Sequence, residues 1–117
     1  MEKLQIQQVV ECNKVLFKLA QQQRLFPFSI GYKLFHIRKL FDEVEDYVFT
    51  VMDNTFDNFN IEDMSEEEKR FMNAIMSSEI ELDYERISIK EFKDNDKVML
   101  SMQDIEKMAI VLNGKEQ

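Results

Sequence analysis

Apolar residues between positions 29 and 57 recur at alternating steps of four and three. This spacing places them on one stripe of a helix, because both steps return the chain to nearly the same side. The stripe consists of Ile30, Leu34, Ile37, Phe41, Val44, Val48 and Val51. We therefore predict a central helix from Ser29 to Asp57, roughly 40 Å long.

Four further apolar side chains of this segment lie off the stripe, so we expect other elements to pack on more than one side of the helix. They are Phe35, Leu40, Tyr47 and Phe49. The heptad-like spacing of the stripe also fits a coiled-coil seam between chains, although packing within one core explains it as well. The helix is longer than a core of this size needs, so one end should protrude or be covered by a partner.

The N-terminal segment predicts another amphipathic helix, from Lys3 to Gln22. Pro27 ends this pattern, since it lacks an amide proton and disfavours a helical residue before it. Ser29 is the expected cap of the central helix, and the short connection predicts antiparallel neighbouring helices. The expected apolar face consists of Ile6, Val9, Val10, Asn13, Leu16, Phe17 and Ala20, with Cys12 beside it.

After a loop expected at residues 58–64, a third helix is predicted. Ser65 and Glu68 have the spacing of a capping box at its start, and it should end near Ser78. Its expected apolar side consists of Phe71, Met72, Ala74 and Ile75.

From position 79 the period changes, and charged and apolar residues alternate as in a half-buried strand up to Tyr84. The alternation slips near Glu85-Arg86, which indicates a bulge, a turn or a change of direction. Residues 93–96 predict a turn, and residues 97–100 are a candidate strand.

Ser101 and Asp104 predict the cap of a last helix, which should end at Asn113-Gly114. Its expected apolar side consists of Met102, Ile105, Met108, Ala109 and Leu112. Together these elements predict a mainly α (α+β) fold. It is a helical hairpin with a long central helix, two further short helices and a small β element near residues 79–100.

The 117 residues are expected to form a single domain, 1–117. Cys12 is the only cysteine, so no intramolecular disulfide can form, which fits a reducing compartment. The N-terminus lacks the basic start and apolar run of a secretory signal, and no stretch approaches the ~18 apolar residues of a membrane span. We expect a protein of the cytosol, or of an assembly made there, with no membrane partner.

Charge is unevenly distributed along the chain. Residues 1–40 carry seven basic and two acidic side chains, whereas residues 41–117 carry eight basic and twenty-one acidic ones. Most of the surface should therefore repel phosphates, so direct nucleic-acid binding is not expected. The layout permits a local basic patch, or an acidic face that meets a basic partner.

An acidic run between positions 53 and 68 is the first candidate partner-binding site. It lacks the ligand spacing and the central glycine of a calcium loop. It is either a solvated loop and helix start, or a face that contacts a basic surface or mimics nucleic-acid phosphates. Its residues are Asp53, Asp57, Glu62, Asp63, Glu66, Glu67 and Glu68.

A basic patch on one side of the helical hairpin is the alternative site. It would bind an acidic protein or, modestly, nucleic acid, and Phe26, Phe28 and Tyr32 lie nearby. No recognised binding motif accompanies these charges. The patch consists of Lys14, Lys18, Arg24, Lys33, Arg38 and Lys39.

Residues that would carry catalysis are sparse. His36 is the only histidine and has no nucleophile motif beside it, which favours a structural or surface role. Cys12 is better explained as a core residue than as a reactive thiol, and one histidine with one cysteine cannot form the usual zinc site. Gly31 and Gly114 are too few for a phosphate-binding loop. We predict no catalytic residue, no metal and no cofactor.

The order of these elements resembles a family of small uncharacterised proteins encoded by tailed bacteriophages. The resemblance implies a phage accessory protein that acts by contact with other proteins, and it assigns no catalytic residue. It rests on the opening helix, Leu25-Phe26-Pro27-Phe28, Tyr32-Lys33-Leu34 with the long helix, the acidic middle, Ile87-Ser88-Ile89-Lys90-Glu91-Phe92, and Ser101-Met102-Gln103-Asp104-Ile105.

Three hypotheses of function follow. The first is a non-enzymatic accessory protein of the virion or its assembly, located in the host cytoplasm or the virion, with self-association compatible with the heptad spacing. The second is an acidic inhibitor of a host defence protein or of another nucleic-acid-binding protein. The third is an enzyme or an enzyme subunit, for which a partner would supply most of the active site.

Overall fold

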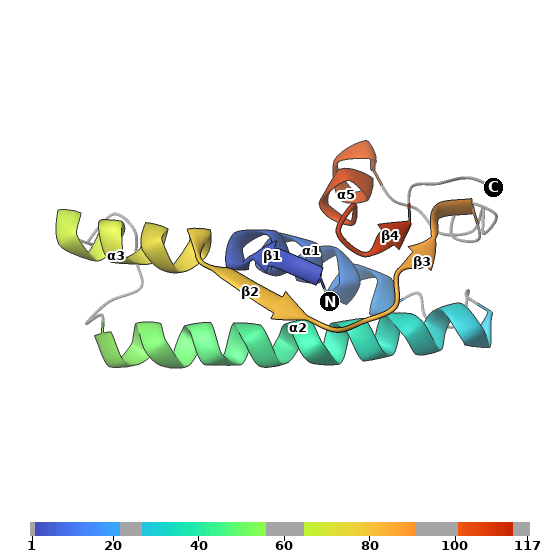
Figure 1. Ribbon diagram of the computed structural model, residues 1–117, viewed down its shortest axis with the longest axis horizontal. Coiled ribbons are helices and arrows are strands. Elements are labelled where there is room, and N and C mark those ends of the chain that lie inside the picture. The colour runs from blue at the N-terminus through green and yellow to red at the C-terminus, as the bar shows by residue number, and fades with distance from the viewer. Residues whose placement is uncertain (1, 22–26, 56–64, 91–100, 114–117) are drawn as a thin grey trace.

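The structure, a computed structural model, describes residues 2–21, 27–55, 65–90 and 101–113 (Figure 1). Its longest helix, α2 (Phe28–Thr55), has 28 residues, and at ~1.5 Å per residue it nearly spans the longest dimension of 47 Å. Helix α1 (Ile6–Ala20) packs along it. The prediction of a mainly helical fold organised around a long central helix is confirmed.

Helices α1 and α2 are antiparallel, as predicted. The Asn13 side-chain amide donates to Asp42 Oδ1 at 2.8 Å, and the Arg38 guanidinium lies 5.3 Å from the centre of the Phe17 ring. Contacts that lie further along α1 therefore meet residues that lie earlier in α2, as in an antiparallel pair of helices.

The predicted stripe of α2 forms the core with α1. Five of its residues are buried, namely Ile30, Leu34, Ile37, Phe41 and Val48, whereas Val44 and Val51 are half-buried. Because this stripe is covered within the chain, the described structure leaves no coiled-coil seam there for a second chain.

The predicted apolar face of α1 is partly wrong. Phe17 is 56% exposed, whereas Val15 and Leu19 are buried. Helix α1 contacts α5 (Met102–Lys107) as well as α2, so its buried arc is wide and is turned away from Phe17. The residues of that arc are Ile6, Val9, Cys12, Asn13, Val15, Leu16 and Leu19.

The predicted cap at Ser29 is also wrong. Helix α2 begins at Phe28, and the carbonyl of Pro27 accepts the first helical hydrogen bond, from Gly31 N at 3.0 Å. Pro27 needs no amide partner of its own, which suits a residue directly before a helix.

Residues 2–5 form a strand instead of the predicted first helical turn. Strand β1 (Glu2–Gln5) pairs antiparallel with β2 (Glu79–Leu82), and Leu4 lies opposite Ile80. This pairing overrides the local helical pattern, and α1 begins only after Gln5, whose amide donates to Gln8 Oε1. The half-buried strand predicted from position 79 is confirmed, but its partner strand lies outside the predicted β region.

Helix α3 (Glu66–Ser77) confirms the capping box and the end near Ser78. The Ser65 amide donates to Glu68 Oε1 at 3.0 Å, and the Glu68 amide donates to Ser65 Oγ at 3.2 Å. Its inner side differs from the prediction, because Phe71 and Ala74 are exposed. Met72 and Ile75, as predicted, and also Met76 pack against Ile6, Val48 and Met52, so α3 covers the far end of α2.

The last predicted helix is shorter than expected. Helix α5 begins after Ser101, whose hydroxyl accepts from the Asp104 amide at 3.1 Å, but it ends at Lys107. The chain then turns so that β4 (Leu112–Asn113) pairs parallel with β3 (Ile87–Ser88). Between β2 and β3 the chain changes direction (Figure 1), which was one of the alternatives predicted near Glu85-Arg86.

The burial of α5 also departs from the prediction. Met102 and Ala109 are exposed, whereas Met108, Val111 and Leu112 are buried, because the segment after the helix turns into the core. The predictions for 58–64, 93–96, 97–100 and Gly114 lie outside the described residues, as do the proposed ends at Gln22 and Asp57.

Candidate binding surface on the central helix

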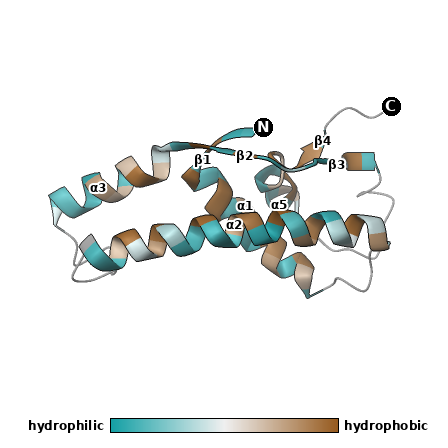
Figure 2. Cartoon of the chain, turned by 60° about the horizontal axis from the view of Figure 1, so that its bottom comes forward, coloured by the Kyte–Doolittle hydropathy of each residue, from teal (hydrophilic) through white to brown (hydrophobic). Residues whose placement is uncertain are grey.

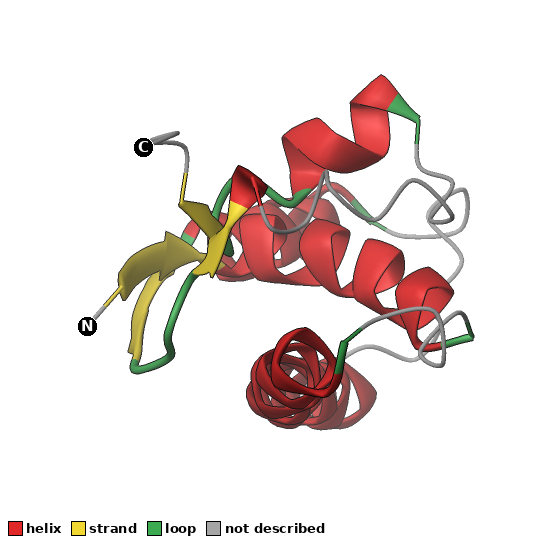
Figure 3. Cartoon of the chain, turned by 90° about the vertical axis from the view of Figure 1, so that its right-hand side faces the viewer, coloured by secondary structure: helices red, strands yellow, loops and turns green. Residues whose placement is uncertain are grey.

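The outer face of α2 is its side opposite the buried stripe. The other labelled helices and strands lie on one side of α2 (Figures 1 and 3), which leaves this outer face uncovered by them. Hydrophobic and hydrophilic segments alternate along it (Figure 2). Phe28, Tyr32 and Phe35 are 85%, 54% and 56% exposed, although they are large apolar side chains. The expectation that off-stripe residues are covered is therefore wrong for Phe35, and Leu40 alone of that predicted set packs on the core.

Four rings contact one another along the first turns of α2, and we call Phe28, Tyr32, Phe35 and His36 the aromatic ladder. Phe28 and Tyr32 are stacked, with ring centres 5.9 Å apart. His36 meets the ring of Tyr32 edge-on at 4.5 Å and that of Phe35 at 5.9 Å. Residues three and four apart are neighbours on a helix, so the helix itself holds these rings together as a continuous apolar surface.

A groove of about 520 Å³ runs beside the ladder, between α2 and the connection from β2 to β3. Tyr32 and His36 belong to both the ladder and the groove. Lys33 Nζ reaches across it to Glu85 Oε1 at 3.5 Å. Its lining combines apolar rings with charges of both signs, and consists of Tyr32, Lys33, His36, Ile37, Lys39, Leu40, Glu43, Asp83, Tyr84 and Glu85.

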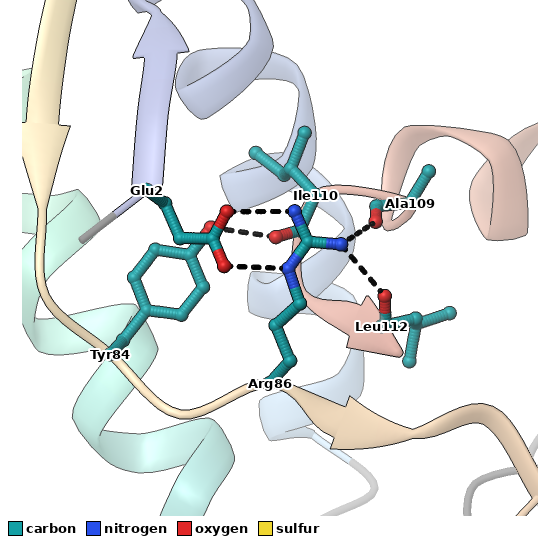
Figure 4. A network of polar contacts seen from close by, with 6 residues as sticks. All are labelled: Glu2, Tyr84, Arg86, Ala109, Ile110 and Leu112. Atoms are coloured by element: carbon teal, nitrogen blue, oxygen red, sulfur yellow. Dashed lines mark hydrogen bonds and ion pairs between the residues drawn. The ribbon is translucent and has the colours of Figure 1, made fainter. Parts of the chain in front are cut away.

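A polar network fixes the wall of the groove that α2 does not supply (Figure 4). Arg86 donates to both carboxylate oxygens of Glu2, at 2.7 and 2.8 Å, and to the carbonyl of Leu112 at 3.1 Å. The Tyr84 hydroxyl donates to the carbonyl of Ile110 at 2.6 Å. Two distant segments, the start of β1 and residues 110–112, therefore hold the β2–β3 connection in place.

The surroundings of Glu2 and Tyr84 in this network shift the pKa of both side chains. Hydrogen bonds from Arg86 lower the pKa of Glu2 below its usual value, because they favour the charged carboxylate. Burial raises the pKa of Tyr84, because it disfavours the phenolate. Tyr84 also meets Phe41 edge-on at 5.7 Å, so the groove wall rests directly on the core.

The outer face of α2 changes charge along its length. Lys39 follows the ladder, and Glu43, Asp46 and Asp53 lie beyond it, all of them exposed. Tyr47 is 70% and Phe49 is 57% exposed, but residues two apart on a helix do not share a face, so they lie on opposite flanks of this one. The first half of the outer face carries the aromatic ladder and Lys39, and the second half is acidic.

The acidic candidate site is described only in part. Asp53 near the end of α2, and Glu66 and Glu67 at the start of α3, are exposed and lie at the same end of the molecule (Figure 1). Glu68 is occupied by the capping box with Ser65. The other three members, Asp57, Glu62 and Asp63, lie outside the described residues.

The basic residues are not brought together as one patch. Lys18 pairs with Asp104 of α5 at 2.8 Å, Lys33 with Glu85, and Arg38 with Asp42 at 3.8 Å beside Phe17. These contacts point to three different parts of the chain and neutralise much of the positive charge. Lys14 and Lys39 are exposed on different helices, and Arg24 lies outside the described residues.

Cys12 and His36 have the local environments that the sequence favoured. Cys12 is fully buried, and burial raises its pKa to about 12, so the reactive thiolate is disfavoured. His36 is an exposed member of the ladder. Among the described residues, no three His, Cys, Asp or Glu side chains are grouped so that they could hold a metal ion.

Comparisons with protein-family models, curated proteins and solved structures gave no match for this chain. Among the helices of the described residues, none combines the length and the apolar composition that crossing a bilayer requires.

Sequence reasoning noticed the aromatic residues but not their arrangement. The positions 28, 32, 35 and 36 have helical spacing and lie opposite the stripe, so a helical projection could have grouped them. The groove depends on the approach of Tyr84 to α2, which no local pattern encodes.

Proposed function

We propose that this protein acts by binding other proteins through the outer face of α2, without catalysing a reaction. The observation that carries the proposal is the aromatic ladder, in which Phe28, Tyr32 and Phe35 are each more than half exposed. Exposed aromatic rings cost solubility and contribute little to folding, whereas they are enriched among the residues that dominate binding energy.

We further propose an accessory role in a phage, as a component of the virion or of its assembly in the host cytoplasm. This part of the proposal is supported by the resemblance to proteins of tailed bacteriophages described above. A contact protein of this kind needs a rigid binding surface rather than an active site, and the ladder on a long helix supplies one.

The test is affinity capture from source cells, with and without infection, followed by mass spectrometry. The variant Phe28→Ser, Tyr32→Ser, Phe35→Ser should lose the proteins that the unchanged chain retains, because the apolar contact surface is gone. Met102→Ser on α5, where the side chain is 74% exposed, is the control and should retain them. Identical retention by all three proteins, each folded by circular dichroism, would contradict the proposal.

The alternative, an acidic inhibitor of a nucleic-acid-binding host protein, is supported by the exposed Asp53, Glu66 and Glu67 at one end of the molecule. Substituting lysine at Glu62, Asp63, Glu66 and Glu67 separates the two functions. An inhibitor should lose its target, since the attraction is electrostatic, whereas binding through the aromatic ladder should persist.

A further inference from the structure

The proposed function leaves the occupant of the outer face open, and the order of residues along that face identifies its chemistry. We propose that the face binds a helix of a partner protein whose contact side is apolar in one half and basic in the other. This inference rests on the proposed function, because it uses the same surface and names the chemistry of the partner.

The first argument is that the aromatic and the acidic residues of α2 lie along one line. Eight positions recur at steps of three and four, which return a helix to nearly the same side, and all eight side chains are exposed. We call this set the outer stripe. Tyr47 and Phe49 are not members, since each lies on a flank of it. The outer stripe consists of Phe28, Tyr32, Phe35, Lys39, Glu43, Asp46, Thr50 and Asp53.

The outer stripe has two halves of different chemistry. Its first three members belong to the aromatic ladder, whereas Glu43, Asp46 and Asp53 lie in the second half. Lys39 marks the boundary, and α2 has no basic residue after it. In the described part of the chain, no ion pair uses Glu43, Asp46 or Asp53. These three carboxylates are therefore open to a cation from outside the chain.

A partner that lies along the outer stripe meets these two environments in turn. Apolar side chains are favoured over the ladder, because they cover rings that are more than half exposed. Lysine or arginine is favoured over the acidic half, and carboxylates there would be repelled. A helix presents its contact residues at the same steps of three and four. Residues 28–53 span ~37 Å, which a partner helix of about 25 residues covers.

The groove beside the ladder gives the partner a place to insert a side chain. It is lined by Tyr32 of the ladder and by Glu43 of the acidic half, so it crosses the boundary between the halves. Asp83 on the opposite wall adds an exposed carboxylate, whereas Lys33 is paired with Glu85. The contact surface is therefore not flat, and its acidic half extends onto the β2–β3 connection.

The experiment measures the binding of synthetic peptides to the full chain by isothermal titration calorimetry. The probe is a helix-forming peptide of about 25 residues, with leucine in one half of its contact side and lysine in the other. It is made with the lysines in its first or in its second half, because the outer stripe does not set the direction of the partner chain. A scrambled peptide of the same composition should bind about tenfold more weakly, since it has the same charge but mixes the two halves.

Variants of the acidic half test the charge contact. Glu43→Lys combined with Asp46→Lys should weaken binding of the probe about tenfold, because two attractions become repulsions. The control with the same change of charge is Glu11→Lys combined with Glu106→Lys, two exposed residues of α1 and α5. It should leave the affinity within about twofold, since these charges lie away from the outer stripe and are screened.

The ladder variant tests the apolar contact. Phe28→Ser, Tyr32→Ser, Phe35→Ser should weaken binding of the same probe by at least about tenfold, because the rings that it covers are gone. A probe that binds through charge alone would lose nothing in this variant, which would contradict the proposed contact.

Equal affinity for the probe and the scrambled peptide would overturn the inference, as would unchanged binding by the Glu43→Lys, Asp46→Lys variant. If neither form of the probe binds while capture from cells still depends on the ladder, the proposed function stands and the partner has another chemistry. If capture is independent of the ladder, the proposed function fails, and this inference fails with it.

Discussion

The two faces of α2 give apolar residues opposite environments. Phe41 on the inner face is fully buried, whereas Phe35, less than two turns earlier on the outer face, is 56% exposed. Both are phenylalanine in the same helix, so neither composition nor helix propensity distinguishes them. The difference is that α1 and Tyr84 cover the inner face, and none of the helices and strands labelled in Figure 1 lies over the outer one, as the view in Figure 3 also shows.

This comparison separates residues that hold the fold from residues that are free to bind. Burying a phenylalanine stabilises a protein by roughly 1.5–3 kcal/mol, and the outer rings gain only part of that from one another. Under the proposed function, these rings stay on the surface because they bind another protein. The clearest tests compare the same substitution on the two faces.

The largest effect is expected for Phe41→Ala on the inner face. Removing a fully buried ring leaves a cavity, so the free energy of unfolding should fall by about 3–5 kcal/mol. Chemical denaturation with urea, read by circular dichroism, measures this change. A loss below about 1 kcal/mol would show that Phe41 is not the core residue described above.

An intermediate effect is expected for Arg86→Gln, next to the residues of the β2–β3 connection that line the groove. The variant loses both bonds to Glu2 and the bond to Leu112, which should cost roughly 1–2 kcal/mol, because these groups are partly exposed and screened.

The cost of Arg86→Gln should depend on pH. The pKa of Glu2 is lowered in the folded protein, so its contribution is complete above the usual value of 4.5 and is lost as the pH falls through the lowered one. The difference between the two proteins, measured by urea unfolding, should therefore be largest near neutral pH and shrink in acid. If the difference in the free energy of unfolding instead grew in acid, the hydrogen bonds between Arg86 and Glu2 would be contradicted.

The smallest effect on folding is expected for Phe35→Ala on the outer face. Its ring is more than half exposed, so the free energy of unfolding of the monomer should change by no more than about 0.5 kcal/mol. Urea unfolding at low protein concentration measures this change without a contribution from association. The same variant should weaken binding to the partner. A loss of stability as large as that of Phe41→Ala would contradict the difference between the two faces.

Much of the fold was predictable because local patterns encode it. The stripe through Phe41 fixes the inner face of α2, and Ser65 and Ser101 accept the capping hydrogen bonds that their spacing predicts. Strand β1 was missed because a strand is stabilised by its partner, and that partner lies at residues 79–82. The early end of α5 has the same cause, since pairing with β3 draws Leu112 out of a helix.

The candidate surface was less predictable than the fold. The charge distribution along the sequence predicted a basic patch. In the structure, Lys18, Lys33 and Arg38 each pair with a different acidic residue of the chain. The ladder has a periodicity that the sequence contains, whereas its exposure depends on where every other element packs. Local patterns say which side chains share a face, and only tertiary structure says which face stays open.

The pairing of β1 with β2 also has a consequence for synthesis of the chain. Gln5 pairs with Glu79, and Glu2 with Leu82, so the first strand has no partner until more than seventy further residues have been added. At about 5–20 residues per second a ribosome needs several seconds for that. During this interval Leu4 and the edge of β1 are uncovered, while α1 and α2 are already available to fold on each other. The β1–β2 sheet can therefore close only after the helical hairpin has been made, and α5 and β4, which follow it in the chain, are added later still.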